Sequence, residues 1–371
     1  MDTWPISVWR LPLPLPSRAE IELLARELEP QATVRIGMIG NRGSRQNLRS
    51  RFSLLGHILP EADLFWQTRN PQNLVNALIS LLFGARVNVL AVAGGDGTLH
   101  HVVNLLVRIS DEISARDGER PRLPPLLVMP GGTMNIFARA FGTKDLPLRA
   151  AARFRELFAE KPIAKLSTRK VGLLHVETQK RGKLVGFVLG SGLVVDALRV
   201  YENLGAGYLG LGRFLAHAAS GSILSTQIWK ENAHRLERGY TQLQLDEDCE
   251  RRARAVVCST IPLSLLRGVI KGMGEPGVAL ATGRFMTLAA GDMSDRELVT
   301  TIPSILTQSA HSGIMREDET KTLRFRGPIT LDGEIFANEE SFQYFEDDEV
   351  QVRRLDFDLD IVRPDWTSLI V

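Results

Sequence analysis

The sequence predicts two domains, an α/β domain built on a doubly wound parallel sheet followed by an antiparallel β-sandwich. The chain has 371 residues, which is more than one ordinary domain needs. Up to about residue 142, short apolar runs alternate with segments of helical spacing across glycine-rich turns. Beyond that point, short strand-like runs follow one another with few helices between them, as in a sandwich.

The first domain is predicted from alternating elements. Ser17 is the expected N-cap of a helix that ends at Leu28. We then expect strands over residues 34–39, 87–93 and 126–129, and helices over 73–82, 102–109 and 134–141. Because strand, turn and helix recur in that order, the sheet should be parallel.

The second domain is predicted from strand-like runs over residues 170–177, 184–189, 241–245, 253–259, 279–288 and 322–329, with a helical interval over about 196–219. We therefore expect an N-terminal arm and helix at 1–32, the α/β domain at 33–145, the sandwich at 146–356, and a tail at 357–371 that returns to the first domain.

Composition excludes several classes of protein. The formal net charge is only +2, so nothing draws the whole chain to nucleic acid. The two cysteines, Cys249 and Cys258, have no metal-ligand spacing and cannot build a disulfide framework, which fits a reducing cytoplasm. The longest apolar stretch, 74–93, is too polar to span a bilayer, so membrane contact should be peripheral. Arginine clusters at 251–254 and 353–354 are typical of a solvated face, with a membrane-surface role as the alternative.

The strongest local motif is Gly94-Gly95-Asp96-Gly97-Thr98, directly after the second predicted strand. The glycines let the backbone approach a ligand, and Thr98 should open a helix whose N–H groups favour phosphate. Asp96 is expected to hold Mg²⁺ or to take a proton. The alternative interpretation is a tight strand-to-helix turn with an Asp cap.

Two further turns repeat this arrangement. Pro130-Gly131-Gly132-Thr133-Met134-Asn135 follows the third strand, and Asn41-Arg42-Gly43-Ser44-Arg45 follows the first. Carboxyl ends of parallel strands share one sheet edge, so the turns predict a single phosphate-binding crevice. For Arg42 and Arg45, ordinary solvent exposure is an equal alternative. The chain has no P-loop motif, and Gly205 to Gly210 fits the dinucleotide pattern in letters only, since it follows no strand.

Four motifs in order resemble the diacylglycerol kinase catalytic-domain family, which includes bacterial lipid kinases, sphingosine kinases and ceramide kinases. They are residues 94–98, residues 130–139, the glycine-rich residues 190–197, and Leu331-Asp332-Gly333-Glu334. The resemblance implies an ATP- and Mg²⁺-dependent lipid kinase with an ATP-binding α/β domain and a lipid-binding sandwich. It also implies a membrane lipid of diacylglycerol, ceramide or sphingoid type as substrate, and a cytoplasmic enzyme bound peripherally to the membrane.

The resemblance also implies roles for single residues. Asp332 matches the general base, a role given in some relatives to the residue that matches Asp96, and Asp96 would bind the metal. Without the family, a hairpin turn is the preferred interpretation of Asp332-Gly333. The residues expected to bind the nucleotide are Asn41, Ser44, Arg45, Thr68, Gly94, Gly95, Asp96, Gly97, Thr98, Gly132, Thr133, Asn135 and Glu334.

The sequence departs from the family pattern at two places. The first loop keeps Asn41 but lacks the usual proline, and His101 stands where the family has a glutamate. We expect His101 to be a buried neutral substitute. A metal site at His100-His101 is disfavoured because neighbours on a helix point about 100° apart.

Two other functions remain open from sequence. One is a kinase for a soluble acceptor, of the NAD kinase or phosphofructokinase type, which the segment 130–139 disfavours. The other is a non-catalytic lipid- or nucleotide-binding regulator, which Asp96, Thr133 and Asp332 oppose. Apolar residues between 194 and 214 are candidates for an acyl pocket or for ordinary core. The sequence leaves the acceptor lipid and a homodimer open.

Overall fold

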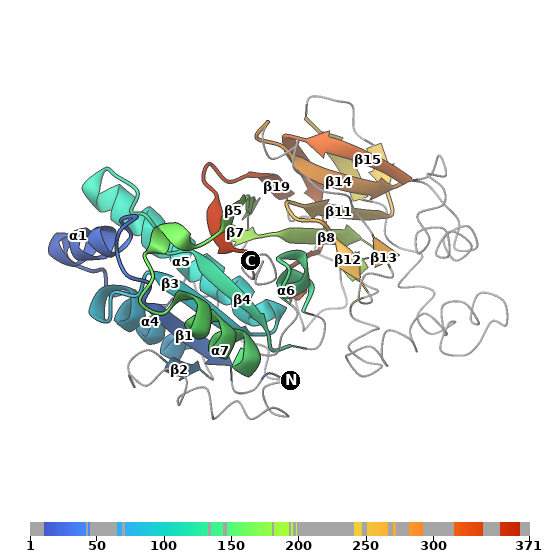
Figure 1. Ribbon diagram of the computed structural model, residues 1–371. Coiled ribbons are helices and arrows are strands. Elements are labelled where there is room, and N and C mark those ends of the chain that lie inside the picture. The colour runs from blue at the N-terminus through green and yellow to red at the C-terminus, as the bar shows by residue number, and fades with distance from the viewer. Residues whose placement is uncertain are drawn as a thin grey trace. The chain divides into compact units, whose positions relative to one another are not determined.

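A computed structural model of the chain describes residues 11–41, 44, 65–68, 71–132, 135–143, 147–179, 182–192, 194–195, 198, 241–246, 251–265, 270–271, 282–291, 315–336 and 349–363. The chain forms two compact units (Figure 1). The first comprises Met1–Val171 with Leu359–Val371, and the second comprises Gly172–Asp358.

The first unit is built on a six-stranded sheet in the order β2-β1-β3-β4-β20-β5. Five strands are parallel, and β5 is antiparallel to β20. Strands β3 and β4 are buried along their whole length, as apolar runs in a parallel sheet should be. The strands are β1 (Ile36–Asn41), β2 (Phe65–Thr68), β3 (Val89–Gly94), β4 (Leu126–Pro130), β5 (Thr168–Val171) and β20 (Leu359–Val362).

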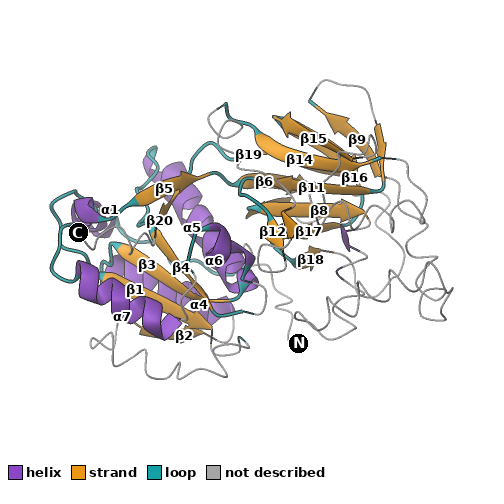
Figure 2. Cartoon of the chain, turned by 45° about the vertical axis from the view of Figure 1, so that its right-hand side comes forward, coloured by secondary structure: helices purple, strands orange, loops and turns teal. Residues whose placement is uncertain are grey.

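Helices flank this sheet (Figure 2). The longest, α5, directly follows β3, packs on it, and ends at Gly118 in the left-handed conformation typical of a C-terminal cap. Helix α7 contacts β4, and α4 contacts β1, β2 and α5. The helices are α1 (Arg18–Glu27), α4 (Pro71–Ile79), the π-helix η4 (Ser80–Gly84), α5 (Asp96–Asp117), α6 (Ile136–Ala140), α7 (Pro147–Phe158) and the 3-10 helix η5 (Ile163–Lys165).

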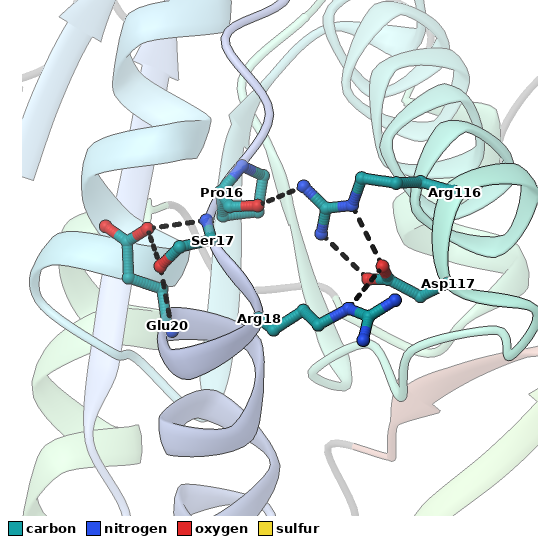
Figure 3. A network of polar contacts seen from close by, with 6 residues as sticks. All are labelled: Pro16, Ser17, Arg18, Glu20, Arg116 and Asp117. Carbon is teal, nitrogen blue, oxygen red and sulfur yellow. Dashed lines mark hydrogen bonds and ion pairs between the residues drawn. The ribbon is translucent and has the colours of Figure 1, made fainter.

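The start of α1 is tied to the end of α5 by a polar network (Figure 3). Ser17 is the N-cap, as predicted, and forms a capping box in which its N–H donates to Glu20 Oε2 at 2.7 Å. Arg116 Nη1 donates to the Pro16 carbonyl at 2.6 Å, and Arg18 pairs with Asp117 at 2.9 Å. These contacts hold the proline-rich arm against the long helix.

The second unit contains two six-stranded antiparallel sheets, in the orders β10-β9-β16-β19-β6-β7 and β15-β14-β11-β8-β17-β18. A two-stranded ladder of β12 and β13 accompanies them. The strands are β6 (Leu174–Thr178), β7 (Gly182–Gly186), β8 (Val188–Gly192), β9 (Thr241–Leu245), β10 (Arg251–Ala253), β11 (Ala255–Ser259), β12 (Ser264–Leu265), β13 (Ile270–Lys271), β14 (Phe285–Ala290), β15 (Met315–Thr320), β16 (Thr322–Arg326), β17 (Ile329–Leu331), β18 (Glu334–Phe336) and β19 (Glu349–Arg354). The predicted fold class is therefore confirmed.

Several predicted strands are divided in the structure. The run at 170–177 is two strands, because β5 pairs with β20 in the first unit while β6 pairs with β7 and β19 in the second. The run at 322–329 breaks at Gly327, whose φ is +145°, and Pro328. The units divide after Val171 rather than at 145, since α7 packs on β4 and β5 joins the first sheet. The predicted helical interval at 196–219 lies almost entirely outside the described residues.

No helix within the described ranges is both long enough and apolar enough to cross a membrane.

Candidate functional site

The carboxyl ends of the parallel strands in the first unit bring the predicted motifs to one sheet edge. The order β2-β1-β3 means that the chain leaves β1 for one neighbour and later returns to its other side. Such a change of direction is where ligands bind in open α/β sheets. Asn41 ends β1, Thr68 ends β2, and Gly94 ends β3 at this edge.

Two of the glycine-rich turns touch each other through their backbones. Gly131 N–H donates to the Gly94 carbonyl at 2.9 Å, and Ser44 Oγ donates to the Gly131 carbonyl. A Cβ placed on Gly132 would lie 2.4 Å from Gly95 Cα, closer than any side chain tolerates. Glycine is therefore required where the turn after β4 crosses the turn after β3.

The third turn is joined to the same edge by Asn41. Its Nδ2 donates to Thr98 Oγ1 at 3.0 Å. Thr98 was predicted to open the helix, but α5 begins at Asp96 with Gly95 as N-cap, and Thr98 is buried at 5% exposure. Its hydroxyl packs where a Cβ on Gly94 would stand, 2.6 Å away, so Thr98 closes the turn from inside.

The Asp96 carboxylate binds the start of α6. Oδ2 accepts from Ile136 N–H and Oδ1 accepts from Phe137 N–H, each at 3.2 Å. Helix N-termini leave such N–H groups without partners, and a carboxylate satisfies them well. Asp96 thus connects the turn after β3 to the helix after β4. The sequence left open whether Asp96 caps a turn or binds a ligand. In the structure Asp96 caps a helix, and the helix that it caps begins 40 residues away rather than next to it.

Asn135 shapes the turn before α6. It is the N-cap residue and adopts φ +50°, a left-handed conformation that asparagine tolerates. Its amide side chain is bound on both sides to Gly132, accepting from the N–H at 2.7 Å and donating to the carbonyl at 2.9 Å. Asn135 therefore fixes the glycine turn and begins α6 two residues later than predicted.

Thr68 carries a polar group that the described residues do not satisfy. The side chain is fully buried at the end of β2, and within the described part of the chain its Oγ1 has no hydrogen-bond partner. Buried hydroxyls are nearly always paired, so an orphan at the ligand edge of the sheet is what an incoming polar group would complete.

Asp332 and Glu334 lie in the second unit, in the β17–β18 hairpin. Leu331 pairs with Glu334, and the two turn residues have φ +56° at Asp332 and +88° at Gly333, as in a two-residue type I′ turn. The preferred interpretation from sequence, a hairpin turn, is therefore correct for the backbone. Glu334 is partly exposed.

The Asp332 side chain nevertheless does more than a turn requires. It is 5% exposed, and Oδ1 accepts from Phe187 N–H at 2.8 Å and from Val188 N–H at 2.9 Å. The predicted strand at 184–189 is divided at this point, because β7 pairs with β6 in one sheet while β8 pairs with β11 and β17 in the other. The carboxylate is held in one orientation at the junction of three strands.

His101 lies on α5 beside the predicted site. Burial, and to a smaller extent the neighbouring His100, lowers the pKa of His101 from 6.5 to about 3. The ring is therefore neutral at physiological pH. His100 is buried at 3% exposure, and the two rings meet edge-on, 5.3 Å between centroids.

The structure brings together most, but not all, of the predicted nucleotide-binding residues. Around the edge of the first sheet lie Asn41, Ser44, Thr68, Gly94, Gly95, Asp96, Gly97, Thr98, Gly132 and Asn135. Arg45 and Thr133 lie outside the described residues. Sequence reasoning missed the amides of Ile136 and Phe137 and of Phe187 and Val188, because nothing in the letters links them to carboxylates 40 and about 145 residues away.

The residues fit ATP phosphates better than they fit a preformed metal cage. Close glycine backbones and the orphan Thr68 hydroxyl suit phosphate oxygens. Within the described ranges, no three His, Cys, Asp or Glu side chains gather to hold a metal ion. Mg²⁺ in kinase sites keeps waters and takes one or two carboxylates plus phosphate oxygens, and Asp96 is a described carboxylate at this edge that could supply one.

Comparison with known proteins agrees with this geometry. A sequence model of the diacylglycerol kinase catalytic domain matches residues 38–164. A crystal structure of a candidate diacylglycerol kinase from Bacillus anthracis str. Sterne aligns with a TM-score of 0.56 at 16% identity, covering 89% of this chain and 97% of its own. A crystal structure of a diacylglycerol kinase from the same organism gives 0.53 at 15%, again covering 89% and 97%. A comparison with curated protein sequences found no match.

Residues 38–164 thus match the diacylglycerol kinase catalytic domain, and the chain shares its two-domain fold with these solved structures. The class of enzyme that this family indicates is a kinase.

Proposed function

We propose that the chain is an ATP- and Mg²⁺-dependent lipid kinase that transfers the γ-phosphate to a hydroxyl group of a membrane lipid. The observation that carries the proposal is the crossing of the glycine turns after β3 and β4 at the carboxyl edge of the sheet. Thr68 ends β2 at the same edge with a buried hydroxyl that has no partner among the described residues. Phosphoryl transfer asks a protein mainly to position the phosphates and neutralise their charge. The family match over residues 38–164 supports a kinase, and the name of that family, diacylglycerol kinase, is the reason we propose a lipid acceptor.

The reaction needs a base for the acceptor hydroxyl. The hydroxyl oxygen forms a bond to the γ-phosphorus, the bond from that phosphorus to the ADP oxygen breaks, and the hydroxyl proton passes to a carboxylate. When bound, Mg²⁺ would neutralise charge on the phosphate oxygens, with Asp96 as its protein ligand. The chain's own residues would position the phosphates with glycine amides and the Thr68 hydroxyl.

Of the two candidate bases, we favour Asp332. Each carboxylate is held by two backbone amides, so these hydrogen bonds do not separate the two candidates. Asp332 is favoured because its place in Leu331-Asp332-Gly333-Glu334 matches the general base of the family that the motifs resemble. Asp332→Asn keeps an oxygen that can accept from Phe187 and Val188, and asparagine tolerates the left-handed φ. The variant should therefore fold like the wild type, lose most of its turnover, and bind ATP normally. Unchanged turnover would leave Asp332 as a hairpin residue alone.

The proposal is tested by transfer of radiolabelled γ-phosphate from ATP with Mg²⁺. The acceptors are diacylglycerol, monoacylglycerol, ceramide and sphingosine in neutral mixed micelles. One labelled lipid establishes both the reaction and the acceptor. ATP binding without any labelled lipid would contradict the proposal and favour a soluble acceptor or a regulator. Label appearing on a soluble acceptor separates those two alternatives.

A further inference from the structure

One sheet of the second unit carries arginines on its outward face. Along β16, Leu323 and Phe325 are buried, while Arg324 and Arg326 between and beyond them are exposed. Successive residues of a strand point to opposite faces, so both arginines leave the core on the same side.

The strand register adds two more arginines to this face. Arg353 on β19 pairs with Thr322, which lies two residues before Arg324 on the same side. Arg252 on β10 pairs with Gln242 of β9, and Gln244, two residues further, pairs with Arg324. The exposed residues Arg252, Arg324, Arg326 and Arg353 therefore share one side of the sheet and are called the arginine face.

The spacing within the arginine face is regular. Two residues along a strand separate Arg324 from Arg326 by about 7 Å, and one intervening strand separates Arg326 from Arg252 by about 10 Å. Gln244, at an outward position of the intervening strand, carries no charge. Arginines at this spacing suit a surface on which single negative charges repeat better than they suit one compact anion.

The arginine face is poor in opposing charge. Within the described residues, the side chains of Arg252, Arg324 and Arg326 form no ion pair, and Arg353 meets Asp356 only at 4.0 Å. The outward positions of the six strands carry the four arginines and Lys183 as basic side chains, and Glu177 and Glu349 as acidic ones. Asp246, at the end of β9, is already engaged by Arg284 at 3.4 Å.

We propose that the arginine face docks the chain on an anionic lipid surface. The inference rests on the proposed function, because an enzyme that phosphorylates a membrane lipid must reach the bilayer. An anionic leaflet attracts each basic side chain near it, and several together bind a protein peripherally. A nucleic acid is a poorer match, since the one aromatic ring at the described outward positions, His175, is buried at 3% exposure and bound by Arg353 Nε at 2.9 Å, which leaves it unable to stack on a base.

The test measures cosedimentation of the full chain with phosphatidylcholine vesicles, with and without phosphatidylserine. The double variant Arg324→Gln, Arg326→Gln should bind the anionic vesicles about 25-fold more weakly, at about fivefold for each arginine removed. The matched control is Arg26→Gln, Arg122→Gln, which removes two exposed arginines from the first unit. It should bind like the wild type, and both double variants should unfold at the wild-type temperature because the changed side chains are exposed.

Binding of the wild type should also weaken as salt is raised, since exposed charges are screened. Equal binding of the wild type to both kinds of vesicle would overturn the proposal, as would equal loss in the control. Retention by a single-stranded oligonucleotide through Arg324 and Arg326, without binding to anionic vesicles, would overturn it in favour of a nucleic acid. Sedimentation needs no ATP, and the kinase assay uses neutral micelles, so each proposal can fail while the other stands.

Discussion

Asp96→Asn is the substitution that best separates the structural role of this carboxylate from a role in catalysis. An asparagine has nearly the same shape but offers one acceptor oxygen, and its NH₂ group would face a second N–H donor. Of the two amides that Asp96 now binds, at 3.2 Å each, one must lose its partner. The change therefore tests the cap on α6 without opening a cavity.

The expected magnitude follows from this geometry. Loss of a capping side chain costs about 0.5–2 kcal/mol, and a distance of 3.2 Å is at the long end for N–H to oxygen. We therefore expect the free energy of unfolding of the first unit to fall by about 1.5 kcal/mol. For a domain of 150–250 residues this lowers the melting temperature by about 3–6 °C.

Calorimetry without nucleotide or magnesium measures this effect, because no ligand can then contribute. Asp332→Asn is the matched control: it removes the same charge but keeps an acceptor for both of its amides, so the second unit should melt almost unchanged. An Asp96→Asn protein that unfolds at the wild-type temperature would refute the role of Asp96 as the cap of α6. Any loss of activity in that variant would then be assigned to the ligand site.

Three further predictions concern the same sheet edge. Gly132→Ala should lower both the melting temperature and nucleotide affinity, since its Cβ would lie 2.4 Å from Gly95 Cα; Gly84→Ala, which meets nothing within 4 Å, is the control in calorimetry and nucleotide titration. Thr68→Val should leave the free energy of unfolding unchanged or slightly raised, because it removes a buried hydroxyl that has no partner among the described residues. It should weaken nucleotide binding measured by titration calorimetry, and normal affinity would exclude a contact between the Thr68 hydroxyl and the nucleotide. Burial lowers the pKa of His101 from 6.5 to about 3 in the folded chain, so the unfolded chain binds the proton first and the free energy of unfolding should fall as pH drops from 6.5 toward 3. His101→Gln should reduce this dependence on pH in denaturant titrations. An equal dependence in the variant would contradict the burial of the ring.

The fold was predictable because its signals are local. A buried apolar run, a glycine turn and a helix start lie within a few residues of one another, and the parallel sheet β1-β3-β4 follows from their repetition. Ser17 with Glu20 was likewise readable as a helix start. Strand ends were less predictable, because partners elsewhere in the chain decide them. Residues 170–177 are apolar enough for one strand, yet Val171 pairs with β20 and Leu174 with β7 and β19.

The candidate site was predicted in its residue types but not in its internal bonds. The motifs located Asp96, Asn135 and Asp332, since glycine neighbours and strand ends expose such residues. What the motifs do not encode is which backbone amides each side chain binds. Those amides come from other turns, so only the folded chain shows that Thr98 points inward and that Asn135 holds Gly132.

The two aspartates illustrate why a carboxylate in a glycine-rich turn need not be free for chemistry. Each is the acceptor for two backbone amides from a segment distant in sequence, and each thereby fixes the turn that follows its own strand. Asp96 uses both oxygens in this way, while both amide bonds to Asp332 converge on Oδ1. A base needs an oxygen that can receive a proton without giving up the bonds that hold it in place. Both carboxylates can meet that requirement, because an oxygen that accepts one amide keeps a second lone pair. The turnover of Asp96→Asn and Asp332→Asn therefore decides which of them takes the proton.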